Sequence, residues 1–240
     1  GFSLGRITAW GGEGGVAGGS GTVFFGPGMP TAPWVTGLNI GNGTVSIPVP
    51  DGTNVNLVVD RLTLFFSEDM EPATVNDASN FDLRSAGADG LHDTVDDVRY
   101  TLASYGYSGG QSANYRILTG PLQPGPYRFT AGTGLRDRAG NPLAAAFVRS
   151  FTVEAAAGFT VENRDNNSRV SATFLQMVED PEGLKTGLGR GNLSSASDTD
   201  YWSFSANSND LLTVAMENPG SPSNSQLYYN VHYPDGSSWF

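Results

Sequence analysis

Residues 61–67 have the sequence Arg-Leu-Thr-Leu-Phe-Phe-Ser, in which Leu62, Leu64 and Phe66 can all point to one side of an extended strand. Successive side chains of a strand point to opposite faces, so this alternation gives the strand one apolar face and one polar face. The apolar face is hidden from water only when a second sheet stacks against it. The stretch therefore predicts a two-sheet β-sandwich.

Further β-prone runs follow and precede this stretch between residues 34 and 153. Turn signals separate them at sandwich-like spacing, as in the Pro- and Gly-rich segments 121–126 and 137–142. The predicted strands are 45–49, 55–59, 62–66, 81–84, 98–103, 115–118, 127–131 and 148–153. We expect one sandwich domain over residues 34–155.

The composition supports an all-β protein and restricts its partners. Of 240 residues 32 are Gly and only 15% are charged, which favours short strands joined by turns. The net charge of -11 repels nucleic acid and anionic lipid but suits cations. The chain has no cysteine, and no apolar run reaches the roughly 18 to 20 residues that cross a bilayer. We expect neither a nucleic-acid partner nor a membrane span.

Two segments flank the expected sandwich. Residues 1–33 are Gly-rich with scattered apolar side chains, so they are either a linker or short strands that pair with the edge strand of another copy or a neighbouring surface protein. Residues 156–240 contain four predicted strands, at 171–178, 201–204, 211–216 and 227–233. We expect a second, incomplete antiparallel sandwich there, within a fragment of a longer polypeptide.

Three motifs in the first sandwich carry a family resemblance. They are Phe-Ser-Glu-Asp-Met-Glu-Pro-Ala-Thr-Val at 66–75, Pro-Gly-Pro-Tyr-Arg-Phe at 124–129 and Asp-Arg-Ala-Gly-Asn-Pro-Leu at 137–143. Together and in this order they resemble the bacterial immunoglobulin-like domain that is repeated in large surface and secreted proteins. The resemblance implies an antiparallel sandwich that serves as a spacer or adhesive module without catalytic activity.

The second module resembles another bacterial family. The motifs are Asn-Asn-Ser at 166–168, Asp-Thr-Asp-Tyr-Trp-Ser-Phe at 198–204, Asn-Asp-Leu-Leu-Thr-Val-Ala-Met at 209–216 and Tyr-Pro-Asp-Gly at 233–236. They are similar to the pre-peptidase C-terminal domain, which includes the collagen-binding modules of some secreted proteases. The resemblance implies a jelly-roll-like sandwich.

The same resemblance implies two sets of site residues. Acidic residues of a leading segment and of an Asp-x-Asp loop would bind calcium together, and strand tyrosines would contact the ligand. The calcium set comprises Glu162, Asp165, Asn166, Asp198 and Asp200, and the ligand contacts are Tyr228 and Tyr233. In the alternative interpretation Asp198 and Asp200 only shape a turn.

A separate acidic loop is a second candidate for a cation. Asp89, Asp93, Asp96 and Asp97 lie within nine residues, spaced by Gly and small side chains. A loop of this kind can surround a hard cation that takes six to eight oxygen ligands, which makes calcium the expected cofactor. The spacing is not that of an EF-hand. The alternative is an exposed loop whose aspartates cap turns.

No residue pattern indicates catalysis. The two histidines, His92 and His232, have neither zinc-site spacing nor a recognisable nucleophile partner. We therefore expect a non-enzymatic structural or adhesive part of a large secreted or cell-surface bacterial protein, with a calcium-stabilised filament or surface-layer subunit as one form. The alternative is an ancillary collagen- or polysaccharide-binding module of a secreted hydrolase. The expected location is extracellular or at the cell surface.

Overall fold

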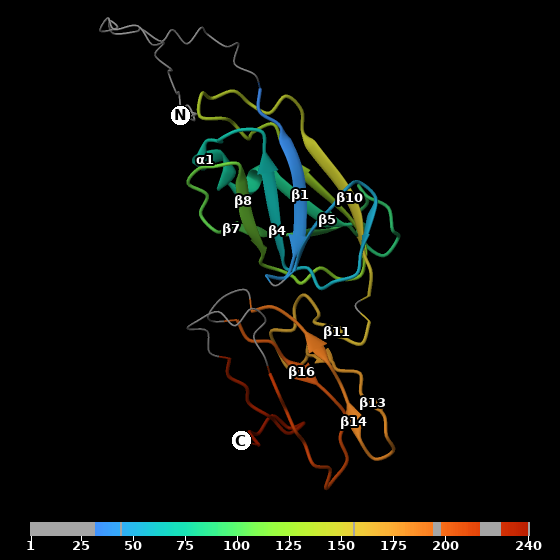
Figure 1. Ribbon diagram of the computed structural model, residues 1–240. Helices are drawn as coiled ribbons and strands as arrows, with labels where there is room; N and C mark the ends of the chain where they lie inside the picture. Colours follow the sequence, from blue (N-terminus) through green and yellow to red (C-terminus); the bar gives the residue numbers. More distant parts are fainter. Residues whose placement is uncertain (1–31, 44, 156, 194–197, 217–226, 240) are drawn as a thin grey trace, which may run out of the picture.

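The computed structural model describes residues 32–43, 45–155, 157–193, 198–216 and 227–239. A β-sandwich forms the upper body in Figure 1, and a smaller body of short strands lies below it. The sandwich has two sheets of five strands, with the orders β2-β1-β4-β8-β7 and β3-β10-β9-β5-β6. Neighbouring strands are antiparallel except for the parallel pair β3 and β10. The prediction of an all-β fold with a sandwich is confirmed.

The sandwich strands follow one another with short connections. The first sheet contains β1 (Val35–Gly41), β2 (Ser46–Pro48), β4 (Arg61–Phe66), β7 (Leu102–Ser104) and β8 (Ser112–Ile117). The second contains β3 (Thr53–Val55), β5 (Phe81–Ser85), β6 (Val98–Tyr100), β9 (Gly125–Ala131) and β10 (Phe147–Val153). A short helix α1 (Pro72–Val75) and a 3-10 turn (Ala78–Asn80) connect β4 to β5. Among the described residues no helix has the length and apolar character needed to cross a bilayer.

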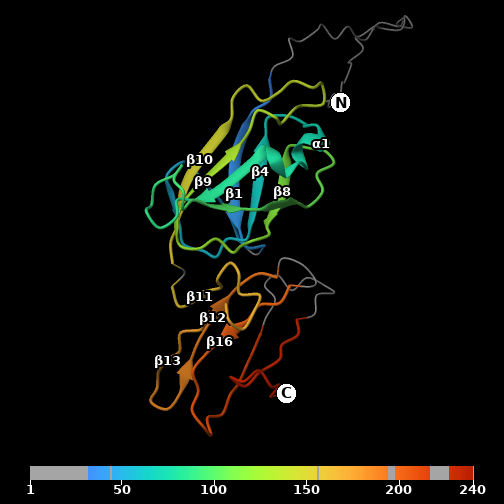
Figure 2. The ribbon, with the colours of Figure 1, turned by 180° about the vertical axis from the view of Figure 1, so that it is seen from behind.

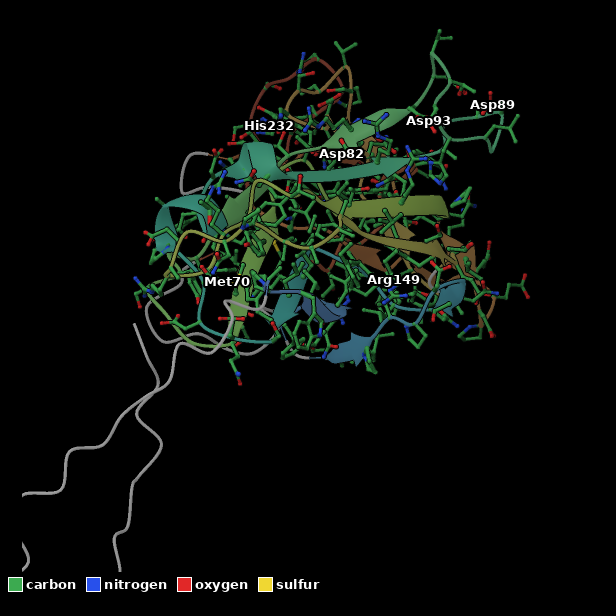
Figure 3. The ribbon with its side chains drawn as sticks, turned by 90° about the horizontal axis from the view of Figure 1, so that it is seen from above. Met70, Asp82, Asp89, Asp93, Arg149 and His232 are labelled. Carbon is green, nitrogen blue, oxygen red and sulfur yellow. The ribbon has the colours of Figure 1, made fainter. Side chains whose placement is uncertain are left out.

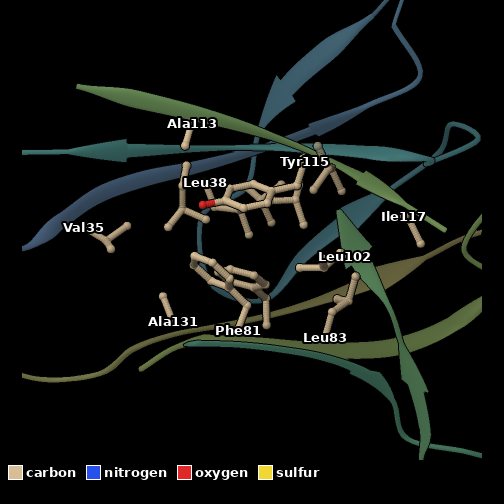
Figure 4. Close-up of a cluster of buried hydrophobic side chains, with 14 of the residues drawn as sticks. Val35, Leu38, Phe81, Leu83, Leu102, Ala113, Tyr115, Ile117 and Ala131 are labelled. Carbon is tan, nitrogen blue, oxygen red and sulfur yellow. The ribbon is translucent and has the colours of Figure 1, made fainter. Parts of the chain in front are cut away.

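The core lies between the two sheets, as Figure 4 shows. Leu62, Leu64 and Phe66 of β4 are all buried, as their alternation predicts. Beside them in the same sheet, Tyr115 of β8 meets Phe81 of the opposite sheet edge to face, with ring centroids 4.8 Å apart. Full burial of a large apolar side chain is worth about 1.5 to 3 kcal/mol, so this contact layer is the main source of stability for the sandwich.

Two features of the sandwich differ from the sequence prediction. Strand β1 was not predicted, because Gly37 and Gly41 interrupt the apolar pattern of Leu38 and Ile40. The predicted strand 98–103 is in fact two strands, since the chain crosses from one sheet to the other at Thr101. Tyr100 and Leu102 are both buried on either side of this crossing. A continuous apolar run therefore concealed a change of sheet.

The second module is less regular than expected. Its described residues form three two-stranded pairs, of which only the last is antiparallel: β11 (Thr160–Val161) with β15 (Gly189–Arg190), β12 (Thr173–Phe174) with β16 (Trp202–Ser203), and β13 (Val178–Glu179) with β14 (Lys185–Thr186). These described residues do not assemble the expected jelly-roll sandwich.

The strand predicted at 211–216 is wrong, and segment 227–233 contributes only a bridge between His232 and Ser238. Leu211 is 96% and Met216 47% exposed, so the described residues offer no sheet that covers the apolar side chains of this segment. A period-two pattern becomes a strand only where another strand offers it hydrogen bonds and another layer hides its apolar face.

Replacement of Leu64 by alanine should strongly destabilise the sandwich. Leu64 is fully buried, so the lost contacts and the cavity should lower the free energy of unfolding by about 2 to 5 kcal/mol. The matched control is Leu91→Ala, because Leu91 is 63% exposed and its loss should cost no more than about 0.5 kcal/mol. Urea unfolding followed by circular dichroism measures both, and equal effects would contradict the core described above.

Candidate functional site

The acidic loop connects β5 to β6 and projects from the edge of the sandwich. Figure 3 shows Asp89 and Asp93 on this loop and Asp82 farther in, on β5. Asp93 forms an ion pair with both terminal nitrogens of Arg128, one of them at 2.8 Å. Arg84 is 3.3 Å from the carboxylate of Asp97. Arg84 and Arg128 of the sheet thus attach the loop to the sandwich through ion pairs.

Asp96 and Asp89 serve the backbone of the same loop. Oδ2 of Asp96 accepts hydrogen bonds from the amides of Ala88 at 2.7 Å and Asp89 at 3.1 Å. Oδ1 of Asp89 accepts from the Leu91 amide at 2.8 Å. These contacts support the alternative in which the aspartates shape the loop, and the calcium hypothesis for this loop stays a prediction.

The electrostatics of the loop agree with this arrangement. The hydrogen bond from Arg128 lowers the pKa of Asp93, and the hydrogen bond from the Asp93 amide, opposed by burial and aided by Arg84, lowers the pKa of Asp97. Both carboxylates are therefore charged near neutral pH and already have partners that stabilise the charge.

The second candidate is a buried acidic pocket in the smaller module. Glu162 is only 2% exposed, although it is a carboxylate. Its Oε1 accepts a hydrogen bond from the Asn192 amide at 2.9 Å, whereas its Oε2 has no hydrogen-bond donor. The pairing of β11 with β15 puts Glu162 beside residues 190–192, so this strand pairing determines the position of the Glu162 side chain.

Asp200 and Asp198 complete the charge of this pocket. Burial raises the pKa of Glu162, and the nearby carboxylates of Asp200 and Asp198 raise it further despite the Asn192 hydrogen bond. Burial also raises the pKa of Asp200, together with the charge of Asp198. Like charges that are buried side by side are unfavourable unless a proton or a cation neutralises them.

The remaining members of the predicted calcium set lie around this pocket to different degrees. Asn166 is buried and its side-chain nitrogen has no partner, while its backbone carbonyl accepts a hydrogen bond from the Tyr201 amide at 2.8 Å. Asp165 is exposed. The carboxylates in the pocket offer oxygen atoms as metal ligands, which suits a hard cation such as calcium. In the described part of the chain, however, no three acidic or histidine side chains converge closely enough to chelate a metal as they stand.

Glu162 and Asn192 also connect the two modules. Gln123 of the sandwich donates from its amide nitrogen to the backbone carbonyl of Glu162 at 2.6 Å. Asn192 donates from its side chain to the carbonyl of Ile117 at 3.2 Å. Because Glu162 and Asn192 also form the pocket, its wall is part of the joint. Sequence analysis missed this joint, since nothing in the local pattern of Gln123 or Asn192 marks a contact with a distant segment.

Arg164 forms the other half of the joint. Its guanidinium lies 4.5 Å from the centre of the Tyr100 ring and donates to the carbonyls of Arg99 at 3.1 Å and Thr119 at 3.3 Å. Tyr100 is itself fixed by a hydrogen bond of 3.0 Å to the buried hydroxyl of Tyr127. The smaller module is thus attached to a rigid end of the sandwich core.

The motifs of the sandwich serve its structure. Met70 and Asp137 form a β-bridge, so the segments 66–75 and 137–143 lie together in space. Asp69 accepts hydrogen bonds from the Tyr107 hydroxyl at 2.8 Å and from Arg138 at 3.2 Å. Asp137 accepts from the amides of Ala139 and Asn141, each at 2.8 Å, which closes the turn.

The predicted ligand-contact tyrosines are at the surface of the smaller module. Tyr228 is 84% exposed, and the half-exposed ring of Tyr233 lies 5.9 Å from that of Trp239. Their exposure is compatible with a contact surface, and collagen binding stays a prediction. His92 lies in the acidic loop and His232 in the bridged segment near Tyr233. The segment 1–31, with its predicted strand pairing, lies outside the described residues.

Comparison with known proteins gives structural matches of limited extent. The N-terminal part of the bacterial S-layer protein SbsC matches with a TM-score of 0.35 and 15% identity over 52% of this chain and 24% of that chain. The S-layer protein rSbsC(31-844) gives 0.35 and 14% over 52% and 14%, and domains 1-6 of surface layer protein SbsC give 0.35 and 13% over 67% and 19%. This chain spans a quarter or less of each. No curated protein matches it.

The sandwich itself matches a sequence family. The bacterial Ig-like domain family matches residues 30–153, which include every strand from β1 to β10. The match also covers the three motifs, two of which form the β-bridge and the closing turn. The family predicted from those motifs is confirmed, and the chain belongs to the bacterial Ig-like domain family.

Proposed function

We propose that this chain is a non-catalytic structural segment of a large extracellular or cell-surface bacterial protein, in which the Ig-like sandwich acts as a spacer. The observation that carries the proposal is the path of the chain. Figures 1 and 2 show β1 beginning at the end of the sandwich away from the smaller module and β10 finishing at the end beside it. A domain whose two chain ends lie at opposite poles adds its full length to a series of domains.

The joint between the modules supports the same role. Gln123, Arg164 and Asn192 supply specific hydrogen bonds across it, so the second module is held in a defined orientation. Two freely hinged modules would span a shorter distance because they bend, whereas two fixed modules keep their full combined length. The S-layer proteins to which the chain shows weak similarity are surface proteins by their descriptions.

The spacer proposal predicts that the chain is displayed outside the cell. Antibodies raised against the purified chain should label intact bacteria that produce it, without permeabilisation, and brief treatment of the cells with protease should remove the label. A cytoplasmic protein serves as the control for cell integrity. Labelling that appears only after permeabilisation would overturn the surface role.

We further propose calcium as the cofactor of the pocket formed by Glu162, Asp198 and Asp200. The support is the buried, undonated Oε2 of Glu162 together with the adjacent carboxylate of Asp200. Calcium accepts backbone carbonyls and water in addition to carboxylates, so the few acidic side chains near the pocket do not exclude it.

Calcium should raise the melting temperature of the wild-type chain relative to a chelator. A bound ion stabilises the folded state by about 2.7 kcal/mol at a hundredfold excess over its dissociation constant. Glu162→Gln should abolish this response and, in chelator, should melt no lower than wild type, because burial already favours the neutral form of Glu162 and the amide is neutral as well. The control Asp89→Asn, in the acidic loop, should keep the response. Loss of the response in Asp89→Asn but not in Glu162→Gln would show that the ion binds the acidic loop of the sandwich, which would contradict the proposal.

A second candidate function is adhesion through the smaller module, as an ancillary binding module of a secreted hydrolase. The observation that favours it is the exposure of Tyr228 and of the Tyr233 and Trp239 pair. Large aromatic side chains at the surface are typical of contact sites.

The adhesive function predicts binding to insoluble collagen that depends on these tyrosines. The double variant Tyr228→Ala, Tyr233→Ala should bind at most about a tenth as tightly as wild type, since truncation of a hot-spot residue, a class in which tyrosine is enriched, costs about 2 kcal/mol or more. The control Phe174→Ala removes another exposed aromatic side chain of the same module and should leave binding unchanged. A pull-down with no retention of the wild-type chain would exclude collagen.

A further inference from the structure

We propose that residues 22–25 of one copy of this chain dock on the apolar face of the β13–β14 hairpin in the next copy, so that copies join head to tail. The inference goes beyond the spacer role, because it assigns the molecule a contact with itself. The contact uses neither the acidic pocket nor the exposed tyrosines.

The first observation is an apolar face of the hairpin that is open to solvent. Val178 of β13 is the partner of Thr186 of β14, so these two side chains point to the same side. Every second side chain along an extended segment shares a side with them. The apolar members of this face are each more than half exposed, and they are Phe174, Val178, Leu184 and Leu188. An exposed apolar surface of this kind marks an interaction site.

The opposite face of the hairpin is already packed within the module. Leu175 and Met177 are half-buried there, beside Gly187. A Cβ atom at Gly187 would lie only 2.7 Å from Sδ of Met177 and 2.9 Å from Cγ of Leu175. The hairpin therefore has apolar side chains on both faces, and the described residues cover only one of them. Such a hairpin is built to lie between two layers.

The hairpin can also accept a further strand. Among the described residues its sheet consists of β13 and β14 alone, so neither outer edge has a ladder partner. An extended segment that adds to such an edge gains main-chain hydrogen bonds, and its side chains can cover the apolar face. The expected occupant is therefore a short, apolar, β-prone segment.

Charge selects the part of the chain that can approach this face. Residues 157–240 carry ten acidic and four basic side chains, a net charge of -6, and residues 32–156 carry thirteen acidic and eight basic, a net charge of -5. Either module of a second copy would therefore be repelled by the module that holds the hairpin. Residues 1–31 contain only Arg6 and Glu13, whose charges cancel. This segment alone meets the acidic module without net repulsion.

Residues 22–25 have the side chains that the apolar face requires. They read Thr-Val-Phe-Phe, which is β-prone, largely apolar and uncharged. Gly21 and Gly26 flank them, and glycine allows a backbone to approach another surface closely. The segment lies outside the described residues, and its sequence is the feature that matches it to the hairpin.

The contact has to join two copies. Phe25 precedes Ala32, the first described residue, by seven residues, so it lies within about 25 Å of Ala32 even in a fully extended chain. Ala32 leads into β1 at the pole of the sandwich away from the smaller module, and the hairpin lies beyond both the sandwich and β11 (Figures 1 and 2). The seven residues of β1 alone extend over roughly 20 Å of that path.

Residues 22–25 therefore cannot reach the hairpin of their own chain. Because the docking segment and the hairpin lie at opposite poles, the contact involves two different surfaces. Such a contact repeats from copy to copy and builds an open, head-to-tail filament.

Disulfide cross-linking tests the contact directly, since the chain has no cysteine of its own. The double variant Thr22→Cys, Thr186→Cys carries one thiol beside the docking aromatic residues and one on the apolar face. Mild oxidation should give a ladder of dimers, trimers and larger species that a reductant returns to monomer. The control Thr22→Cys, Val95→Cys carries its second thiol at an exposed position of the acidic loop and should give no ladder. An equal ladder in the control, monomer alone, or a disulfide within one chain would overturn the proposal.

Analytical ultracentrifugation of the purified chain tests the apolar nature of the contact. The wild-type chain should associate as its concentration rises, and Leu188→Asp should weaken association about tenfold or more, because the variant would bury a charge. Leu211→Asp alters an exposed leucine outside the hairpin and should associate like wild type. Circular dichroism should show that both variants are folded. Equal weakening in both, or a wild-type chain that stays monomeric, would refute the assignment. The measurement does not use cells, so its result is independent of the surface-labelling experiment.

Discussion

Burial of the inner face of β4 against the opposite sheet is the constraint on which the rest of the structure depends. β4 lies between β1 and β8, and its side chains Leu62, Leu64 and Phe66 are buried almost completely. Because successive side chains alternate, the same packing determines which residues point outward. A shift of one residue would bury Arg61 and Thr63 and expose the leucines. The outward positions are therefore as strictly determined as the core itself.

The motifs that identify the Ig-like family stabilise the fold rather than form a site. Asp69, Tyr107 and Arg138 hold segment 66–75 against the turn 137–143, and Asp137 satisfies the amides of that turn. Buried or half-buried carboxylates of this kind are stable because each oxygen accepts at least one hydrogen bond. Function in such a family resides in the surfaces that the scaffold presents, and these differ from one member to another.

Glu162 is the contrasting case, because it is buried without a full set of donors. Its environment favours neutralisation of the carboxylate, and its backbone carbonyl receives the hydrogen bond from Gln123 of the sandwich. The acidic pocket and the joint therefore share the same few residues. A group that neutralises the pocket acts directly beside the contacts that hold the two modules together.

The sequence by itself determined the all-β class, the sandwich and the family, because the alternation in Leu62, Leu64 and Phe66 and the turn motifs are local signals. It did not reveal β1, the change of sheet at Thr101, or the irregular smaller module, since strands also need partners that local pattern does not specify. It grouped the aspartates of the 89–97 loop by proximity in the chain, whereas only a family resemblance grouped Glu162 with Asp198 and Asp200. The tertiary structure instead paired Asp93 with Arg128, buried Glu162 and set Arg61 beside Arg116. The physical reason is that charge and hydrogen bonding act across space, between groups that only register and stacking bring together.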